Sequence, residues 1–156
     1  MRGMRIPRAA FGVLKEVLRH LLRRPVVGLV AVARVPDGRL LLIRRADTGG
    51  WALPGGTLEW GETLRSTLPR ELAEEAGVTV LSPGELLGVY SSPDRDPRFH
   101  AVTVVVAAEV SMPGPPPQNP LEILEVGLFA PDAVPPLSHG FDDVVKAALA
   151  KRPVWE

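Results

Sequence analysis

Four of the five glutamates and one of the two arginines between Gly56 and Val78 are spaced in a way that suits the binding of a divalent metal against a phosphate. The stretch reads GTLEWGETLRSTLPRELAEEAGV, and an apolar residue stands at every fourth position of its second half: Leu64, Leu68, Leu72 and Ala76. This spacing predicts a helix over Thr63–Ala76 with one face toward a core. Glu71 and Glu75 are also four residues apart, so their carboxylates lie one above the other on the opposite side of the helix.

Glutamates this close on one helix repel each other, by roughly a few tenths of a kcal/mol for an exposed pair, unless a cation lies between them. Glu74 adjoins Glu75 and adds a third carboxylate. Oxygen ligands favour Mg²⁺ or Mn²⁺, which bind a few carboxylates, keep several waters and accept phosphate oxygens. Pro54, Gly55 and Gly56 predict a loop ahead of the helix, where a backbone carbonyl can approach the metal. The residues therefore indicate a phosphate ester or anhydride as the substrate.

This stretch resembles the Nudix box, which is a glycine, five residues, Glu, seven residues, then Arg-Glu-aliphatic-any-Glu-Glu-any-Gly-aliphatic. Nine specified positions agree with that pattern: Gly56, Glu62, Arg70, Glu71, Leu72, Glu74, Glu75, Gly77 and Val78. The preceding Trp51–Gly55, WALPG, is similar to the usual approach to the box in that family. The resemblance implies an α/β protein of the Nudix fold, an α/β/α sandwich around a mixed β-sheet, over about Val26–Lys151.

The resemblance also implies metal-dependent hydrolysis of a nucleoside diphosphate linked to another group. Glu71 and Glu75 would be the principal ligands of Mg²⁺ or Mn²⁺. The full metal shell that it implies is Gly56 through its carbonyl, Glu62, Glu71, Glu74 and Glu75. As catalytic residues, Glu74 would help to activate water and Arg70 would orient the glutamates through charge-assisted hydrogen bonds. The metals would polarise phosphoryl oxygens and lower the pKa of the attacking water.

Three positions depart from the family pattern. Thr67 and Leu68 stand where many relatives have two alanines, and Pro69 lies inside the expected helix. A proline in a helix interior removes one backbone donor and clashes with the preceding turn, at a cost of about 3 kcal/mol. We therefore expect a kink or a late helix start. If the kink turned Glu62 away from Glu71 and Glu75, activity would fall without the loss of any ligand. The alternative for the whole stretch is an ordinary solvated helix with an acidic stripe.

Substrate choice in the family is set outside the box, and the polar segment Tyr90–His100, YSSPDRDPRFH, lies between two apolar runs. Arginine forks match phosphate oxygens, and carboxylates accept from sugar hydroxyls. The candidate substrate-binding residues of this segment are Asp94, Arg95, Asp96, Arg98 and His100. Pro93 stands fifteen residues after Val78, which resembles a marker of ADP-ribose pyrophosphatases. The alternative is a solvated turn rich in proline and aspartate.

Residues outside that segment supply further candidates. Arg44 and Arg45 follow an apolar run and are candidate phosphate contacts, with a solvated strand end as the alternative. Some relatives use a late glutamate as the catalytic base. Glu122 is the preferred candidate over Glu125, and the alternative is that neither of them is the base. His139 has no partner visible in the sequence, so we expect it to be a surface or packing residue.

The favoured function is cleavage of the diphosphate in ADP-ribose or a related nucleoside diphosphate sugar, which gives a nucleoside monophosphate and a sugar phosphate. Two alternatives stay open. One is a (d)NTP pyrophosphohydrolase that cleanses the nucleotide pool. The other is a nucleotide sensor without turnover, although such domains commonly lose a box carboxylate and this chain keeps them all.

The composition suits a single domain with a core, because the chain has 156 residues, of which 46% are hydrophobic and 23% charged. The formal net charge is zero, with 18 basic and 18 acidic residues, so nothing general favours nucleic acid as a partner. The absence of cysteine excludes disulfides, thiolate metal sites and thiol nucleophiles. We expect a small-molecule nucleotide substrate and a cytoplasmic location.

The apolar runs Val26–Arg34 and Leu40–Arg44, separated by Pro36, Asp37 and Gly38, predict a β-hairpin. Further segments are expected to form strands at Val78–Leu81, Leu86–Tyr90, Ala101–Val110 and Val126–Phe129, and a helix at Asp142–Lys151. Hairpins mixed with helices suggest a mixed sheet between helices.

Residues 1–25 are expected to form a separate amphipathic basic helix ahead of a Nudix hydrolase domain at residues 26–156. Its apolar stripe comprises Phe11, Leu14, Leu18, Leu21 and Leu22, flanked by basic residues. The helix would pack on the domain or on a second copy in a homodimer, lie on a membrane surface, or be a flexible or processed extension. It is too short and too charged to span a bilayer.

Overall fold

The structure is a computed structural model, and it describes residues 12–13, 15–18, 23–114 and 120–156. From Val26 onward, groups of strands are separated by helices. In order they are β1 (Val26–Arg34), β2 (Leu40–Arg45), β3 (Trp51–Ala52), β4 (Gly55–Thr57), α2 (Leu64–Ala76), β5 (Val80–Tyr90), β6 (Ala101–Val110), β7 (Ile123–Phe129), the 3₁₀ helix η1 (Ser138–Gly140), α3 (Phe141–Leu149) and β8 (Val154–Trp155).

All these strands join one mixed sheet, with the order β3-β2-β1-β6-β5-β8, while β4 pairs with β1 and β7 with β2. β1 is parallel to β6 from Val26 opposite Ala101 onward. It is antiparallel to β2, as the predicted hairpin requires. Its first half also pairs antiparallel with β4, with Leu29 opposite Gly56. The segment that leads into the box helix is therefore fixed on the central strand.

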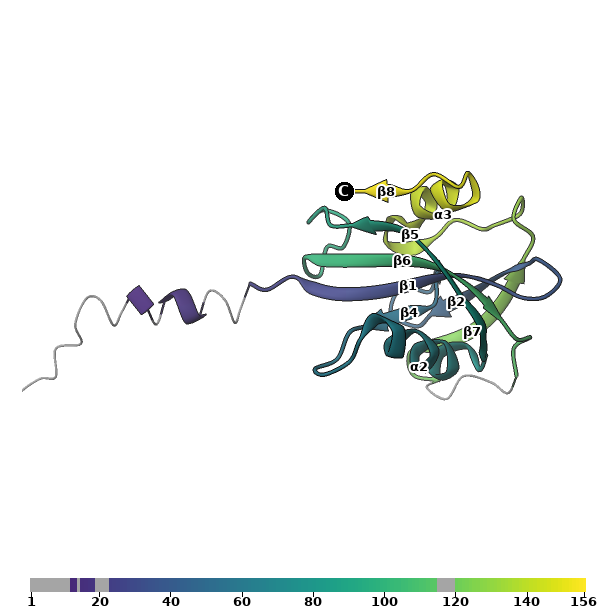
Figure 1. Cartoon of the computed structure of the whole chain (residues 1–156), viewed down its shortest axis with the longest axis horizontal. Coiled ribbons are helices and arrows are strands. Elements are labelled where there is room, and N and C mark those ends of the chain that lie inside the picture. Colours follow the sequence, from purple (N-terminus) through teal and green to yellow (C-terminus); the bar gives the residue numbers. More distant parts are fainter. Residues whose placement is uncertain (1–11, 14, 19–22, 115–119) are drawn as a thin grey trace, which may run out of the picture.

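One helix covers each face of the sheet, and Figure 1 shows α2 and α3 on opposite sides of the strands. Alternate residues of β1 serve the two faces, as the period of a strand requires. Leu29 and Ala31 join the core that contains Leu72 of α2, whereas Val30 joins the core that contains Val144 of α3. The predicted α/β/α sandwich around a mixed sheet is confirmed.

The box helix begins and ends with defined caps. The Thr63 hydroxyl accepts from the Ser66 N–H, and the Ser66 hydroxyl accepts from the Thr63 N–H, while Gly77 ends the helix with φ 63°. The predicted late start is wrong, since α2 begins at Leu64 and continues through Pro69 as one helix to Ala76. Only one intrahelical bond is lost at the proline, and both the caps and the buried leucines hold the helix.

Three other segments differ from the sequence expectation. The predicted loop at Pro54–Gly56 contains strand β4, because its backbone pairs with β1. The two strands expected before Tyr90 form one strand, β5, whose register against β6 shifts around Pro83 and Leu86. Such shifts are how an antiparallel pair accommodates a proline without ending the strand. The short strand β8, parallel to β5, had no signal in the sequence.

The N-terminal helix lies only partly within the described residues. Residues 12–13 and 15–18 are helical, with Val13, Val17 and Leu18 exposed. Phe11, Leu14, Leu21 and Leu22 fall outside the described part. The division at residue 25, the homodimer contact and the cytoplasmic location therefore stay predictions. Within the described residues, no helix combines the length and the apolar character needed to cross a membrane.

Candidate active site

Glu75 is a buried carboxylate in the wall between α2 and β4. It is only 8% exposed, and its Oε2 accepts a hydrogen bond from the Gly55 N–H at 2.8 Å. Burial raises the pKa of Glu75 to about 7, the nearby charges of Glu71 and Glu122 add to the rise, and Gly55 and Arg45 oppose it. At neutral pH this side chain is thus poised between its neutral and its charged form.

Glycines set the distance between β4 and α2. A Cβ added at Gly56 would overlap the carboxylate of Glu71, and a Cβ added at Gly55 would overlap the Leu29 carbonyl on β1. Only glycine therefore lets β4 dock on β1 while Glu71 reaches the strand. Burial is also the main reason why the pKa of Glu71 is raised, although Arg70 opposes the rise. Glu71, Glu75 and the backbone of Gly55–Gly56 form one oxygen-rich corner.

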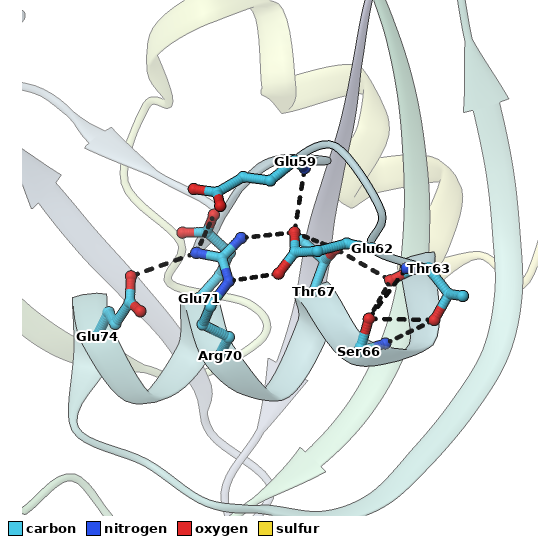
Figure 2. A network of polar contacts seen from close by, with 8 residues as sticks. All are labelled: Glu59, Glu62, Thr63, Ser66, Thr67, Arg70, Glu71 and Glu74. Carbon is cyan, nitrogen blue, oxygen red and sulfur yellow. Dashed lines mark hydrogen bonds and ion pairs between the residues drawn. The ribbon is translucent and has the colours of Figure 1, made fainter.

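Arg70 holds three carboxylates together, as Figure 2 shows. Its Nε and Nη2 donate to the two oxygens of Glu62, at 2.8 and 2.9 Å. Its Nη1 lies 3.1 Å from Glu71 Oε1 and donates to Glu74 Oε2 at 3.3 Å. The pKa of Glu62 is lowered to about 2, first by Arg70 and then by the Glu59 N–H. Arg70 therefore holds Glu62 together with Glu71 and Glu74, although Pro69 lies inside the helix.

A pocket of about 210 Å³ opens beside Gly55 and Gly56, on the side away from α2. Residues far apart in the chain line it. Its apolar wall includes Phe99 and Phe141, and its polar lining is Arg45, Asp96, Arg98 and His139. A substrate that enters this pocket would lie next to the glycines that adjoin Glu71 and Glu75.

Comparison with known proteins decides the family. A model of the NUDIX domain matches residues 22–149. The chain belongs to the Nudix family. An ADP-ribose pyrophosphatase from Methanocaldococcus jannaschii is 47% identical over 77 residues, which cover 47% of this chain and 45% of that protein. An RNA pyrophosphohydrolase from Caulobacter vibrioides is 46% identical over 74 residues, covering 46% of this chain and 40% of that protein.

Solved structures agree with the family. The crystal structure of a MutT NUDIX hydrolase from Burkholderia pseudomallei is 34% identical, with a TM-score of 0.69, and the match covers 80% of this chain and 98% of that one. The chain spans less than half the length of the two curated relatives above. Those two relatives are named for different substrates, ADP-ribose and RNA, so the matches leave the substrate of this Nudix protein open.

Nudix hydrolases generally use divalent metal ions, and the donors of the corner fit such an ion in their chemistry. They are carboxylate and carbonyl oxygens, which hard cations prefer. Glu75 and Glu71 are carboxylates whose ionised forms burial disfavours, and a bound cation would offset that penalty. Within residues 23–114 and 120–156, no three His, Asp or Glu side chains are gathered closely enough to hold an ion. Arg70 instead gathers the carboxylates of Glu62, Glu71 and Glu74.

Two of the predicted substrate-binding arginines line the pocket, and both are paired. Arg45 donates to both oxygens of Asp47, at 3.0 and 3.1 Å. Arg98 contacts Asp96 at 2.7 Å and Asp47 at 2.9 Å. Asp47 therefore links the end of β2 to the loop between β5 and β6. The two arginines and the two aspartates together carry no net charge.

Asp96, another predicted substrate-binding residue, also lines that pocket, whereas the remaining ones lie outside it. Arg44 contacts Glu125 at 3.2 Å, and the His100 Nε2 lies 2.9 Å from the Ser91 carbonyl oxygen. Asp94 and Arg95 line a neighbouring depression. Their part in substrate binding stays a prediction.

Arg95 has a bracing role that its sequence context did not reveal. It contacts Glu156 at 2.8 Å and Asp143 at 2.9 Å and lies 4.5 Å over the ring of Tyr90. The Glu156 carboxylate also accepts from the N–H groups of Ser91 and Ser92. Arg95 thus joins the loop after β5 to α3 and β8.

The two candidate late glutamates differ in position. The Glu122 carbonyl accepts from the Ala46 N–H at 2.8 Å, and its carboxylate is near enough to Glu75 to raise the pKa of that side chain. Glu125 is paired with Arg44. Position therefore favours Glu122 over Glu125 as a group that can reach the corner.

His139 is the pocket residue that sequence reasoning missed. It was expected on the surface or in packing, yet it lines the pocket. Its φ is 59°, in a region where few residues other than glycine lie. The only sequence signal was a histidine followed by glycine at the start of a helix, which does not point to a binding site.

Proposed function

We propose that this Nudix protein is a metal-dependent pyrophosphohydrolase that cleaves the diphosphate of ADP-ribose or a related nucleoside diphosphate sugar. The products would be a nucleoside monophosphate and a sugar phosphate. The observation that carries the proposal is the corner where buried Glu75 and Glu71 meet the backbone of Gly55–Gly56, directly beside a pocket with polar and aromatic walls.

The residues divide the work between holding the metal and holding the substrate. Glu71, Glu75 and the Gly56 carbonyl would hold Mg²⁺ or Mn²⁺, with Glu74 and Glu62 completing the shell directly or through water. When bound, the metal would polarise the phosphoryl oxygens and lower the pKa of a water molecule. Arg70 would keep the glutamates aligned, as its contacts with Glu62, Glu71 and Glu74 suggest.

Phosphate contacts would come from Arg45 and Arg98, whose guanidinium groups line the pocket and can exchange a carboxylate partner for a phosphate. Glu122 would take the proton from the attacking water, because it is the late glutamate that influences Glu75. Support for an ADP-ribose-like substrate comes from the name of the relative from Methanocaldococcus jannaschii and from Pro93.

A second candidate is the same chemistry on a nucleoside triphosphate. The observation in its favour is the structure named MutT NUDIX hydrolase, which is 34% identical to this chain over 80% of its length. The products separate the two candidates, since a triphosphate would release inorganic pyrophosphate and a monophosphate.

The test is hydrolysis of a panel of ADP-ribose, other nucleotide sugars, dinucleotides and dNTPs with Mg²⁺ or Mn²⁺, with products resolved by chromatography. We expect AMP and ribose phosphate from ADP-ribose. Glu75→Gln should lower kcat/KM by more than about 100-fold, because outer-shell residues alone typically account for 10–100-fold. Preferred release of pyrophosphate from a dNTP would favour the second candidate. Absence of hydrolysis for every substrate of the panel would contradict both candidates.

A further inference from the structure

The turn that carries His139 is anchored on three sides. The Leu137 N–H donates to Asp142 Oδ1 at 3.1 Å, the Ser138 hydroxyl donates to Thr48 Oγ1 at 3.2 Å, and Leu137 forms a β-bridge with Trp51. These contacts tie the turn to the start of α3 and to the β2–β3 connection. The position of the imidazole is therefore set by the body of the domain.

The backbone at this turn is held in an uncommon conformation. His139 has φ 59° and ψ 27°, and Gly140 has φ 69°, so two consecutive residues are left-handed. Histidine is tolerated there less readily than glycine, and strain of this kind persists when the surroundings fix it. Because such residues gather at binding sites, the observation directs attention to what the side chain does.

The imidazole has a hydrogen-bonding atom that the protein leaves unused. His139 Nε2 is buried and has no hydrogen-bond partner among the described residues, and no other described side chain shows a buried polar atom in that state. Buried polar atoms are normally satisfied. The side chain lines the pocket with Phe99 and Phe141, so a molecule bound there is the candidate partner for this nitrogen.

Around His139 the pocket favours an uncharged ring over an anion beyond the substrate phosphates. Those phosphates would occupy its two guanidinium groups, Arg45 and Arg98, which pair with Asp47 and Asp96 in the structure. The pKa of His139 is lowered, first by burial and then by the charge of Arg98, so the imidazole is neutral at neutral pH, with one donor and one acceptor nitrogen. Aromatic walls and a neutral hydrogen-bonding group suit a flat ring with polar edges.

We infer that His139 is a specificity-determining residue, which hydrogen-bonds an uncharged ring of the nucleotide, its base or its terminal sugar, in the pocket beside Gly55 and Gly56. The inference rests on the proposed function for the substrate being a nucleotide. Beyond that function, it names the residue that recognises the ring and states that the ring is uncharged.

The test compares kcat/KM of the wild type and His139→Asn on two matched series. One series keeps the sugar and changes the base: ADP-glucose, GDP-glucose and UDP-glucose. The other keeps the base and changes the sugar: ADP-ribose, ADP-glucose and ADP-mannose. Asparagine tolerates a left-handed backbone but is shorter than histidine. We expect the ratio between the preferred and the disfavoured member of one series to shrink about five- to tenfold, the size of one lost hydrogen bond.

A matched control is Lys151→Asn, which changes the other described non-glycine residue with a positive φ, 50°, outside the pocket. A folding defect would lower kcat/KM for all substrates by the same factor, so the ratios within each series would stay unchanged. Loss of discrimination in the base series places the base at His139, and loss in the sugar series places the sugar there. Equal ratios in both series for wild type and His139→Asn would overturn the inference.

Binding of the same nucleotides in EDTA, followed by calorimetry, separates this inference from the proposed function. If nothing is hydrolysed but the wild type discriminates between rings in binding and His139→Asn does not, the proposed function fails and the inference stands. If no nucleotide binds the wild type, or the variant binds every nucleotide as the wild type does, the inference fails.

Discussion

Glu62 and Glu75 are the same residue type at two ends of one site, and their surroundings act on them in opposite directions. Glu62 is partly exposed, and Arg70 first of all lowers its pKa to about 2. Glu75 is buried, and burial raises its pKa to about 7. One carboxylate is charged because the protein supplies the cation. The other is disfavoured as an anion because it is buried, and the hydrogen bond from the Gly55 N–H offsets only part of that effect.

The difference separates two tasks within the Nudix box. At the other end, Arg70 compensates the charge of Glu62 and holds that carboxylate in place. The Glu75 end has a low local dielectric, and no described Lys or Arg forms an ion pair with its carboxylate, so a bound divalent ion has its largest effect there. Three measurements test this division, one on the buried end, one on the arginine and one on the exposed end.

The largest effect is expected on stability at the buried end. The folded-state pKa of Glu75, about 7, lies above the ordinary value of 4.5, so folding favours its neutral form. The wild type should therefore lose stability relative to Glu75→Gln as pH rises from 4.5 to 7 in EDTA, by up to about 3 kcal/mol. Thermal unfolding of both proteins from pH 4.5 to 8 measures the difference in Tm.

The metal supplies the internal check on that measurement. Mg²⁺ or Mn²⁺ should raise the Tm of the wild type more at pH 8 than at pH 5, because the ligand form of Glu75 is the charged one. Glu75→Gln should show little of this rise. A Tm difference that stays flat with pH, or equal metal effects on both proteins, would contradict the assignment of Glu75.

Arg70→Gln should lower kcat/KM by about 10–100-fold and weaken metal binding, because Arg70 holds the carboxylates of Glu62, Glu71 and Glu74 in place. Titration of Mn²⁺ against activity measures both quantities. Arg65→Gln is the matched control, since it removes the same charge from the same helix outside the network that Figure 2 draws. Equal losses in the two variants would show that only the charge of the helix matters.

The smallest effect is expected at the exposed end. Since the folded-state pKa of Glu62 is lowered from 4.5 to about 2, its pairing with Arg70 stabilises the fold above pH 4.5 and is lost as pH falls through 2. Glu62→Gln should thus lower Tm slightly at pH 7, and the difference should shrink between pH 4.5 and 2. A difference that grows toward acid pH would assign Glu62 to the same class as Glu75.

The box could be predicted from the sequence because its geometry is local. Helical spacing places Glu71 and Glu75 together, and the helix from Leu64 to Ala76 forms as the apolar repeat predicts. The late helix start predicted from Pro69 was wrong, because helix propensity counts the lost hydrogen bond but not the stabilisation from the caps and the buried face. The hairpin of β1 and β2 was likewise set by local signals.

The pocket could not be predicted in the same way, because three distant segments build it. Arg45 ends β2, Arg98 lies in the loop before β6, and His139 belongs to η1. Nothing in their local sequence says that β1 and β6 run parallel and bring these segments to one place. The environment of Glu75 has the same origin, since the helix pattern marks it as a surface residue while β4 covers it.

The position of β1 has a consequence for how the site arises in time. β1 pairs with β2, β4 and β6, and its partner in β6 begins at Ala101, opposite Val26. Closing so long a stretch of chain is a slow step in folding, and contacts that depend on it form late. Because residues of β6, η1 and α3 line the pocket beside β1 and β4, the pocket cannot take shape in a nascent chain that stops at the box helix; it must await the emergence of these later segments.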